Sequence, residues 1–169
     1  MKYKKNFIIE SDENFYYEGY SKNNKYYGKG ILIDLNTKNI FEGIFIDSNL
    51  EYSGRIINNN GIIYKGQVSN SRKNGLGYEK NIKTGSIYHG DFLDDMKNGF
   101  GNLETKFERY SGYFLNDKMH GKGYLEASDF TYTGKFENGS INGFGKKQFK
   151  DGRYYNGFFS NGIFEGRGE

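Results

Sequence analysis

The clearest repeat unit in the chain reads Tyr110-Ser111-Gly112-Tyr113-Phe114-Leu115-Asn116-Asp117-Lys118-Met119-His120-Gly121-Lys122-Gly123-Tyr124. It joins an aromatic-x-Gly tripeptide to a polar link and then to a Gly-x-Gly tripeptide. On both sides of it the aromatic-x-Gly tripeptide recurs 22 to 24 residues apart, beginning at Tyr17, Phe41, Tyr64, Tyr88, Tyr110, Tyr132 and Tyr155. Self-similarity at so regular a period indicates a repeat protein.

The Gly-x-Gly tripeptide recurs at the same period and lies between the aromatic tripeptides. It begins at Gly28, Gly75, Gly99, Gly121 and Gly143, and once more at Gly166. The period that starts at Phe41 departs from this pattern, because Tyr52 stands where the first glycine belongs. Residues 41–63 are therefore predicted to form a degenerate repeat.

Each period is predicted to form a β-hairpin. From Phe130 to Phe136, apolar residues and glycine alternate with Thr and Lys, which is the period of two of a strand with one apolar face. The links between hairpins are rich in Asn, Asp and Gly, the residues that suit tight turns. A single hairpin is not stable alone. We therefore expect one array of about seven hairpins over residues 1–169, with residues 1–21 as an N-terminal cap hairpin.

The composition of the 169 residues agrees with a thin sheet. Hydrophobic residues make up 35% and aromatic residues 18%, so many small aromatic contacts replace a thick core, and disorder is excluded. The 24 basic and 21 acidic side chains lack the strongly basic balance of a nucleic-acid-binding protein. The chain has no Cys, no signal-peptide pattern and no apolar run of the roughly 20 residues that a membrane span needs. A soluble, cytoplasmic protein is predicted.

Motifs that carry chemistry are scarce. His89 and His120, the two histidines, lie far apart in the sequence and have no acidic residue placed to assist them. The Gly-x-Gly tripeptides lack the third glycine of a dinucleotide-binding fingerprint, and the Asp94-Asp95 pair lacks the spacing of an EF-hand loop. The sequence therefore predicts no catalytic residue, no metal ligand and no cofactor, and we expect a protein that is not an enzyme.

The pattern resembles the MORN (membrane occupation and recognition nexus) repeat family. The segments from Tyr110 to Tyr124 and from Tyr132 to Gly145 carry its Tyr-x-Gly-x-aromatic pattern, its polar turn and its Gly-x-Gly. Where the family usually has Trp, this chain has Phe, at Phe45, Phe92, Phe114, Phe136 and Phe159. The resemblance implies an all-β fold, an elongated single-layer antiparallel sheet of tandem hairpins with a groove along one face.

What the resemblance implies for function is a protein–protein interaction scaffold in a cytoskeletal, ciliary or membrane-apposed assembly. The groove would bind a helix or an extended segment of a partner protein, because rigid aromatic side chains within a polar rim suit recognition. Self-association at the C-terminal edge of the sheet is also expected. The sequence leaves open which face forms the groove. The predicted contact residues are the aromatic residues of five tripeptides, Tyr64, Tyr88, Tyr110, Tyr132 and Tyr155.

Two alternatives remain at this stage. The first is weak binding of acidic phospholipid headgroups at an anionic membrane surface, to which each basic residue near the surface contributes about 1 kcal/mol. Its candidate residues recur in and near the polar links, at Arg72, Lys73, Lys97, Lys118, Lys122, Lys146 and Lys147. The second is that the repeats are the accessory region of a larger enzyme.

Overall fold

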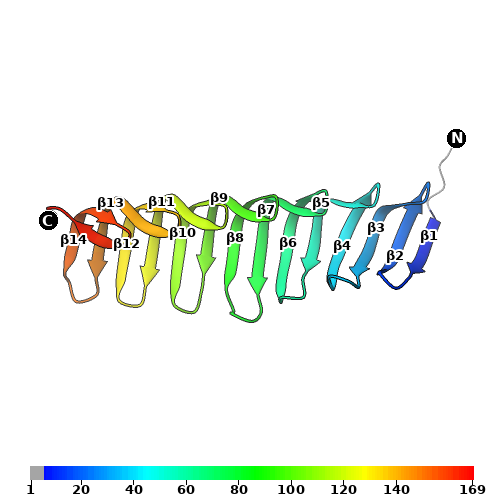
Figure 1. Cartoon of the computed structure of the whole chain (residues 1–169), viewed down its shortest axis with the longest axis horizontal. Coiled ribbons are helices and arrows are strands. Elements are labelled where there is room, and N and C mark those ends of the chain that lie inside the picture. Colours follow the sequence, from blue (N-terminus) through cyan, green and yellow to red (C-terminus); the bar gives the residue numbers. More distant parts are fainter. Residues whose placement is uncertain (1–5) are drawn as a thin grey trace. The chain divides into compact units, whose positions relative to one another are not determined.

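The computed structural model describes residues 6–169, and this part of the chain consists of β-strands and turns without a helix. Within β1 to β7 and within β8 to β15, each strand pairs antiparallel with its neighbours in chain order (Figure 1). The described residues fall into two compact units, divided between Lys83 and Thr84. The predicted all-β architecture of antiparallel hairpins is thereby confirmed, and each unit is a single layer of strands.

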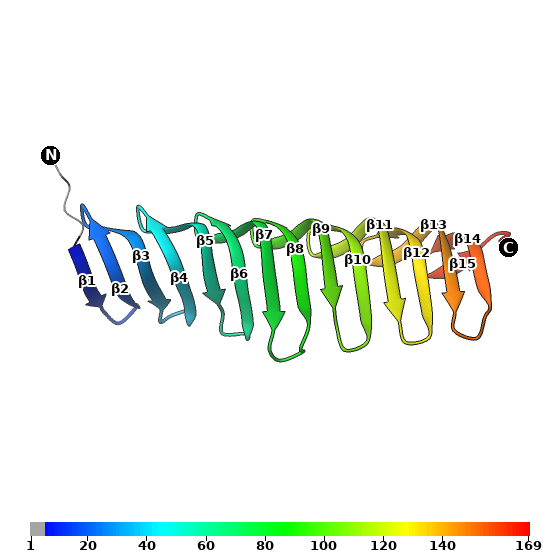
Figure 2. The same cartoon turned by 180° about the vertical axis from the view of Figure 1, so that it is seen from behind.

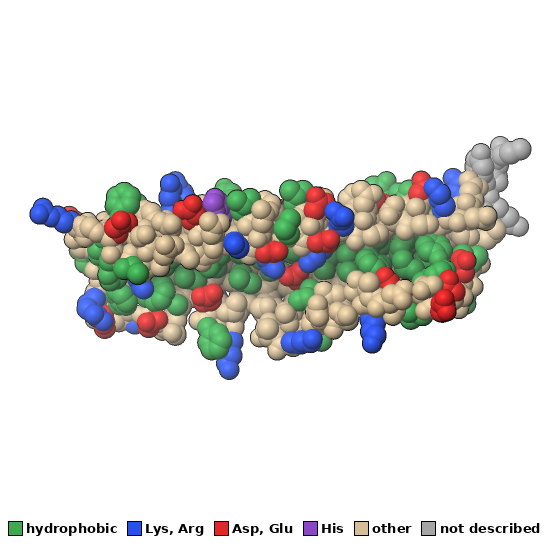
Figure 3. Space-filling model, in the orientation of Figure 1, with side chains coloured by type: hydrophobic (Ala, Val, Ile, Leu, Met, Phe, Trp, Pro, Cys, Tyr) green, Lys and Arg blue, Asp and Glu red, His purple; other side chains and the backbone are tan. Residues whose placement is uncertain are grey.

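The first unit holds seven strands, and residues 1–5 of the predicted cap hairpin lie outside the described residues. In order they are β1 (Asn6–Ser11), β2 (Phe15–Lys22), β3 (Lys25–Asp34), β4 (Asn39–Ile46), β5 (Asn49–Ile57), β6 (Ile62–Ser69) and β7 (Arg72–Asn81). β1 pairs with β2 across the turn at residues 12–14, from Ser11 opposite Tyr16 to Asn6 opposite Ser21. In Figure 3, hydrophobic side chains gather over β2 to β4 of this unit.

The second unit holds eight strands, whose succession can also be followed from behind in Figure 2. They are β8 (Ile87–Leu93), β9 (Met96–Glu104), β10 (Glu108–Leu115), β11 (Lys118–Ala127), β12 (Phe130–Glu137), β13 (Ser140–Phe149), β14 (Tyr154–Ser160) and β15 (Ile163–Glu165). The hairpin predicted around residues 127–129 is present, because β11 pairs with β12 from Glu126 opposite Thr131 to Gly121 opposite Phe136.

The polar links form two-residue turns in which both residues have positive φ. At Asn116-Asp117 the φ angles are 49° and 66°, the values of a type I′ turn, whose twist matches that of the flanking strands. The Asp94-Asp95 pair, with φ of 46° and 71°, is another turn of this kind. The same geometry recurs at Asn23-Asn24, Asp47-Ser48, Asn70-Ser71, Asn138-Gly139 and Asn161-Gly162.

A β-bulge follows six of these turns, all except Asn161-Gly162, and lies at the Gly-x-Gly tripeptide or at its counterpart in the degenerate repeat. Between β10 and β11 the register shifts next to Gly112, and Gly121 on the facing strand has a φ of 64°. A positive φ favours glycine, because a Cβ would crowd the backbone. In the degenerate repeat Tyr52 occupies this place with a φ of 63°, and Gly54 is the second glycine, paired with Gly43 and Gly66.

Replacing Tyr52 by glycine is therefore expected to stabilise the protein. The left-handed conformation costs an L-residue about 1–2 kcal/mol, and the flexibility of glycine in the unfolded chain offsets part of that gain. We expect Tyr52→Gly to raise the free energy of unfolding by about 0.5–1 kcal/mol in chemical denaturation. Tyr52→Ala removes the same ring, which is 68% exposed, but keeps the strained Cβ, so equal effects of the two variants would contradict this explanation.

The core is built by tyrosine rings that lie over pairs of glycines. Gly112 on β10 faces Gly123 on β11, and a Cβ on Gly123 would lie 2.7 Å from Cζ of Tyr110. The ring edges of Phe114 and Phe136 pack on Tyr110 with centroids 5.1 and 5.0 Å away. The contacts repeat along the unit as an aromatic ladder, made of Tyr88, Phe92, Tyr110, Phe114, Tyr132, Phe136, Tyr155 and Phe159.

The first unit varies this arrangement. Tyr17 covers Gly19 and Gly30, and the ring of Tyr26 stacks on it at 3.6 Å. In the degenerate repeat, where the tripeptide begins with Phe41, it is Leu50 instead that fills the space over Gly43 and Gly54.

Candidate binding groove

The tyrosines predicted as partner contacts lie in the packed interior. Tyr64, Tyr88, Tyr110 and Tyr132 are at most 2% exposed, and Tyr155 is partly buried. Each hydroxyl donates a hydrogen bond to the carbonyl three residues later, as Tyr110 does to Tyr113 at 2.9 Å. Burial raises the pKa of Tyr110 to about 12, because the charged form would lose its hydration. The role that the structure gives these rings is packing.

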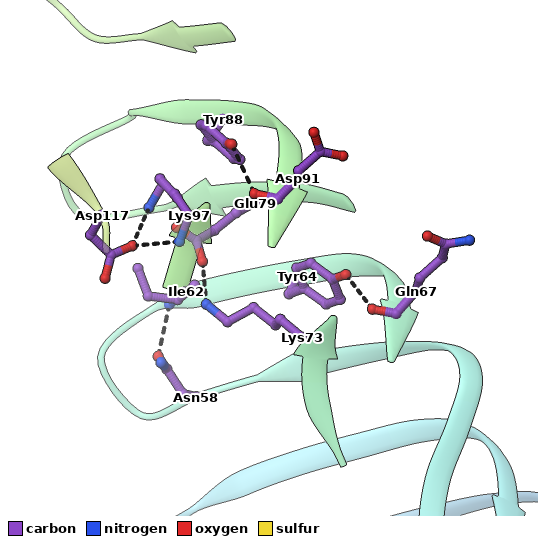
Figure 4. Close-up of polar contacts among 10 residues, drawn as sticks. All are labelled: Asn58, Ile62, Tyr64, Gln67, Lys73, Glu79, Tyr88, Asp91, Lys97 and Asp117. Carbon is purple, nitrogen blue, oxygen red and sulfur yellow. Dashed lines mark hydrogen bonds and ion pairs between the residues drawn. The ribbon is translucent and has the colours of Figure 1, made fainter. Parts of the chain in front are cut away.

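The basic residues predicted for lipid binding are dispersed. Lys73 forms an ion pair with Glu79, and Lys97 forms one with Asp117. The ammonium group of Lys73 also lies near the ring of Tyr64, and that of Lys97 near the ring of Tyr88 (Figure 4). The Nζ atom of Lys147 lies 3.8 Å from the centroid of the Phe130 ring. Arg72 and Lys118 are exposed and directly follow two-residue turns.

Lys122 and Lys146, the remaining two, come together in an open groove of the second unit. The groove has a volume of about 860 Å³ and lies on the face opposite the aromatic ladder, since its side chains alternate with ladder residues along each strand. The paired glycines Gly112, Gly123, Gly134 and Gly145 line its floor. We call it the second-unit groove, and its large side chains are Phe100, Tyr113, Tyr124, Phe144, Lys122, Lys135 and Lys146.

The charged side chains that line the second-unit groove are all positive. Lys122 and Lys135 stand directly opposite each other on β11 and β12, an arrangement of like charges that destabilises a sheet. Neither has an ion-pair partner among residues 6–169, and no carboxylate lines the groove. An anionic group placed between these two ammonium groups would relieve their repulsion.

Aromatic pairs flank the two lysines on either side. Phe100 and Tyr113 face each other across β9 and β10 with ring centroids 5.7 Å apart. Phe144 and Phe158 do the same across β13 and β14 at 5.5 Å. All four rings are exposed, although they pack edge to face. The groove therefore combines apolar surface at both ends with positive charge between them.

Sequence reasoning missed most of these residues, since only Lys122 and Lys146 were among the candidates. The signal was present at two positions of each repeat: the residue directly after the glycine of the aromatic tripeptide, such as Tyr113, and the middle residue of Gly-x-Gly, such as Phe100. Both point away from the ladder, and large apolar side chains there stay about half exposed even where they pack on each other, as Phe100 and Tyr113 do.

The first unit has a hollow on the corresponding face with a different charge. Its volume is about 550 Å³, and Phe7, Tyr20, Ile31 and Ile44 supply its apolar side chains. Glu18 and Glu42 line it together with Lys29. The two units therefore present different chemistry on this face, and the first would repel the anionic group that the second attracts.

Between residues 6 and 169, no three His, Asp or Glu side chains come together as a metal site would require. This part of the chain also contains no helix that is long and apolar enough to cross a membrane.

Comparison with known proteins adds three findings. A family model of the MORN repeat matches residues 64–80, 88–104, 110–129, 132–152 and 155–169, which together exceed half of the chain. No curated protein is similar to the chain. Among solved structures, the chain is similar to the SAS-4 (dCPAP) TCP domain of Drosophila melanogaster, in a complex with a proline rich motif of Ana2 (dSTIL). That likeness has a TM-score of 0.47 and 13% identity and covers 91% of this chain and 77% of the other.

Proposed function

Because the chain belongs to the MORN repeat family, we propose that it is a protein-interaction module that holds a segment of a partner protein in the second-unit groove. One observation carries the proposal: Phe100, Tyr113 and Phe144 are 48%, 53% and 54% exposed and line one groove. Clustered apolar surface of this kind marks interaction sites, and aromatic anchors supply much of the binding energy at interfaces.

The glycine floor supports a bound segment as well. Because a side chain at Gly112, Gly123, Gly134 or Gly145 would point toward the ladder tyrosines, none projects into the groove at these positions, and a partner backbone could approach the sheet there. The rim provides hydroxyl and amide groups from Ser111, Thr133 and Asn156. Apolar side chains bordered by polar groups are the usual anatomy of a protein interface.

The assignment to a cytoskeletal, ciliary or membrane-apposed assembly in the cytoplasm remains a prediction, as do self-association and membership of a larger enzyme.

Lipid binding is less well supported than protein binding. Lys73 and Lys97 are engaged in ion pairs, and Lys147 lies over Phe130 on the ladder face, so the proposed lipid-binding residues do not share one surface.

We expect the double variant Tyr113→Ser with Phe144→Ser to lose its partner. Removing two aromatic anchors of an interface costs about 2 kcal/mol or more each, so retention on immobilised protein should fall below detection. The measurement is affinity capture from lysate of cells that produce the protein, with mass spectrometry of what is retained.

The matched control is Phe107→Ser. It removes a ring that is 76% exposed at the turn between β9 and β10, outside the groove, and should leave capture unchanged. Thermal unfolding of all variants checks that they fold. Proteins retained equally by the wild type and the double variant would refute the groove assignment. Flotation on vesicles with phosphatidylinositol phosphates, lost with Lys122→Gln and Lys146→Gln, would favour the lipid alternative.

A further inference from the structure

Aromatic and lysine side chains follow one another in a regular order across the strands of the second-unit groove. The middle residues of three successive Gly-x-Gly tripeptides are Phe100 on β9, Lys122 on β11 and Phe144 on β13. The residues after three tripeptide glycines follow the same order, with Tyr113 on β10, Lys135 on β12 and Phe158 on β14. Across the strands, both rows therefore read aromatic, lysine, aromatic.

Within the chain, a neighbouring repeat shows how a carboxylate is held at this type of position. The Oδ2 atom of Asp91 accepts a hydrogen bond from the backbone N–H of Phe100 at 3.0 Å, and Oε1 of Gln67 accepts one from Leu76 at 2.7 Å. In the next two repeats Tyr113 and Lys135 replace these acceptors.

No side chain in the described part of the protein accepts from the corresponding N–H groups of Lys122 and Phe144. A carboxylate from a partner, placed between Lys122 and Lys135, would meet two ammonium groups that have no ion-pair partner among residues 6–169. Charge-assisted hydrogen bonds of this kind are about twice as strong as neutral ones. The charge of the groove thus selects an acidic side chain.

The spacing of each row selects the conformation of the partner. Neighbouring strands lie about 4.8 Å apart, so successive members of a row are about 9.6 Å apart. A polyproline-II helix has three residues per turn and rises about 3.1 Å per residue, so every third side chain lies on one side at about 9.3 Å.

Other regular conformations fit this spacing less well. An α-helix returns to nearly the same face after seven residues, which span about 10.5 Å. Over two such repeats this length exceeds the spacing of the groove side chains, about 9.6 Å each, by about 1.8 Å. A β-strand presents one face every second residue, at about 6.7 Å, and cannot match one side chain per hairpin. Two turns of a polyproline-II helix differ from the same groove spacing by only about 0.6 Å.

From these observations we propose that the second-unit groove binds a polyproline-II segment that runs across the strands of the sheet. The segment carries apolar, acidic and apolar side chains at every third residue. Its carboxylate lies between Lys122 and Lys135, and its apolar side chains contact the pairs Phe100–Tyr113 and Phe144–Phe158. This inference rests on the proposed function and specifies the chemistry of the partner.

The test uses three labelled peptides and the full chain. The first peptide, Leu-Pro-Pro-Glu-Pro-Pro-Leu, has the proposed spacing. The second, Leu-Pro-Glu-Pro-Pro-Pro-Leu, has the same composition with the acid one residue out of register, and the third replaces Glu by Gln in the first. Fluorescence anisotropy gives the three affinities.

We expect the first peptide to bind at least about tenfold more tightly than the other two, because each loses the charged contact. Lys122→Gln with Lys135→Gln should abolish this preference. The control Lys106→Gln with Lys118→Gln removes the same charge from exposed sites of the second unit outside the groove, and should keep it.

Equal affinity for all three peptides, or a preference that survives Lys122→Gln with Lys135→Gln, would overturn the inference. Absence of binding by every peptide would overturn it too, while capture by the wild type that is lost in Tyr113→Ser with Phe144→Ser would still support the proposed function. Binding to phosphoinositide vesicles in place of the first peptide would assign the lysines to a lipid headgroup and likewise overturn it.

Discussion

Replacing Tyr110 by alanine is expected to lower the free energy of unfolding by about 3–5 kcal/mol, the range for removal of a large buried aromatic side chain. The ring lies between the edges of Phe114 and Phe136 and covers the facing glycines Gly112 and Gly123. Its loss leaves a cavity that the sheet cannot close, because glycines have no side chains to move into it. Chemical denaturation followed by circular dichroism measures the change.

Tyr110→Phe is the matched control, because it keeps the ring and removes only the hydroxyl. That hydroxyl donates to the carbonyl oxygen of Tyr113 at 2.9 Å, so a loss of about 1 kcal/mol is expected. If Tyr110→Ala unfolded at the same denaturant concentration as the wild type, the ring would not be core. The role of partner contact predicted from sequence would then be the better explanation.

The second large effect is expected for Gly123→Ala, at about 3 kcal/mol of destabilisation. An added Cβ would lie 2.5 Å from Cε2 and 2.7 Å from Cζ of Tyr110 and would also meet its hydroxyl. The ring cannot move aside, since it is held by two phenylalanine edges and a hydrogen bond. The midpoint of chemical denaturation reports the loss.

A double-variant cycle isolates the cause of this effect. The nearest heavy atoms to the added Cβ all belong to Tyr110, so in the Tyr110→Ala background the clash is absent. Gly123→Ala should then cost less than about 1 kcal/mol, and the two changes should be strongly non-additive. Additive effects would show that Gly123 is required by the backbone and not by the ring.

Much of the fold could be predicted from the sequence because its signals are local and repeated. The period gives the hairpins, and the Asn and Asp residues of the links give turns with positive φ, as at Asn116-Asp117. The alternation around Tyr132 gives two faces. These signals depend on neighbouring residues in the chain, and the register between adjacent strands follows from them.

The candidate site was harder to predict. The alternation of side chains along a strand assigns residues to two faces of the sheet, but it does not tell which face is buried. The side chains of Tyr64 and Tyr132 are buried in part because each ring covers a glycine from the next strand, a contact between residues 13 positions apart. The exposed rings, such as Tyr113, share their residue type with the buried ones. Lys146 and Lys147 are adjacent basic residues, yet the first lines the groove and the second lies over Phe130 on the opposite face.

The placement of core and groove on opposite faces has a consequence for how such an array can change. Tyrosine and paired glycines satisfy the fold from one side, so each hairpin carries two positions, such as Phe100 and Tyr113, whose identity folding leaves open. A substitution at one of these positions changes one contact of the binding surface and leaves the contacts of the other hairpins unchanged. Inserting or deleting one whole period would displace everything beyond it by a single hairpin. A polyproline-II ligand, which has three residues per turn, would then need three residues more or fewer to contact the same side chains. Each hairpin of the array therefore corresponds to three residues of the ligand.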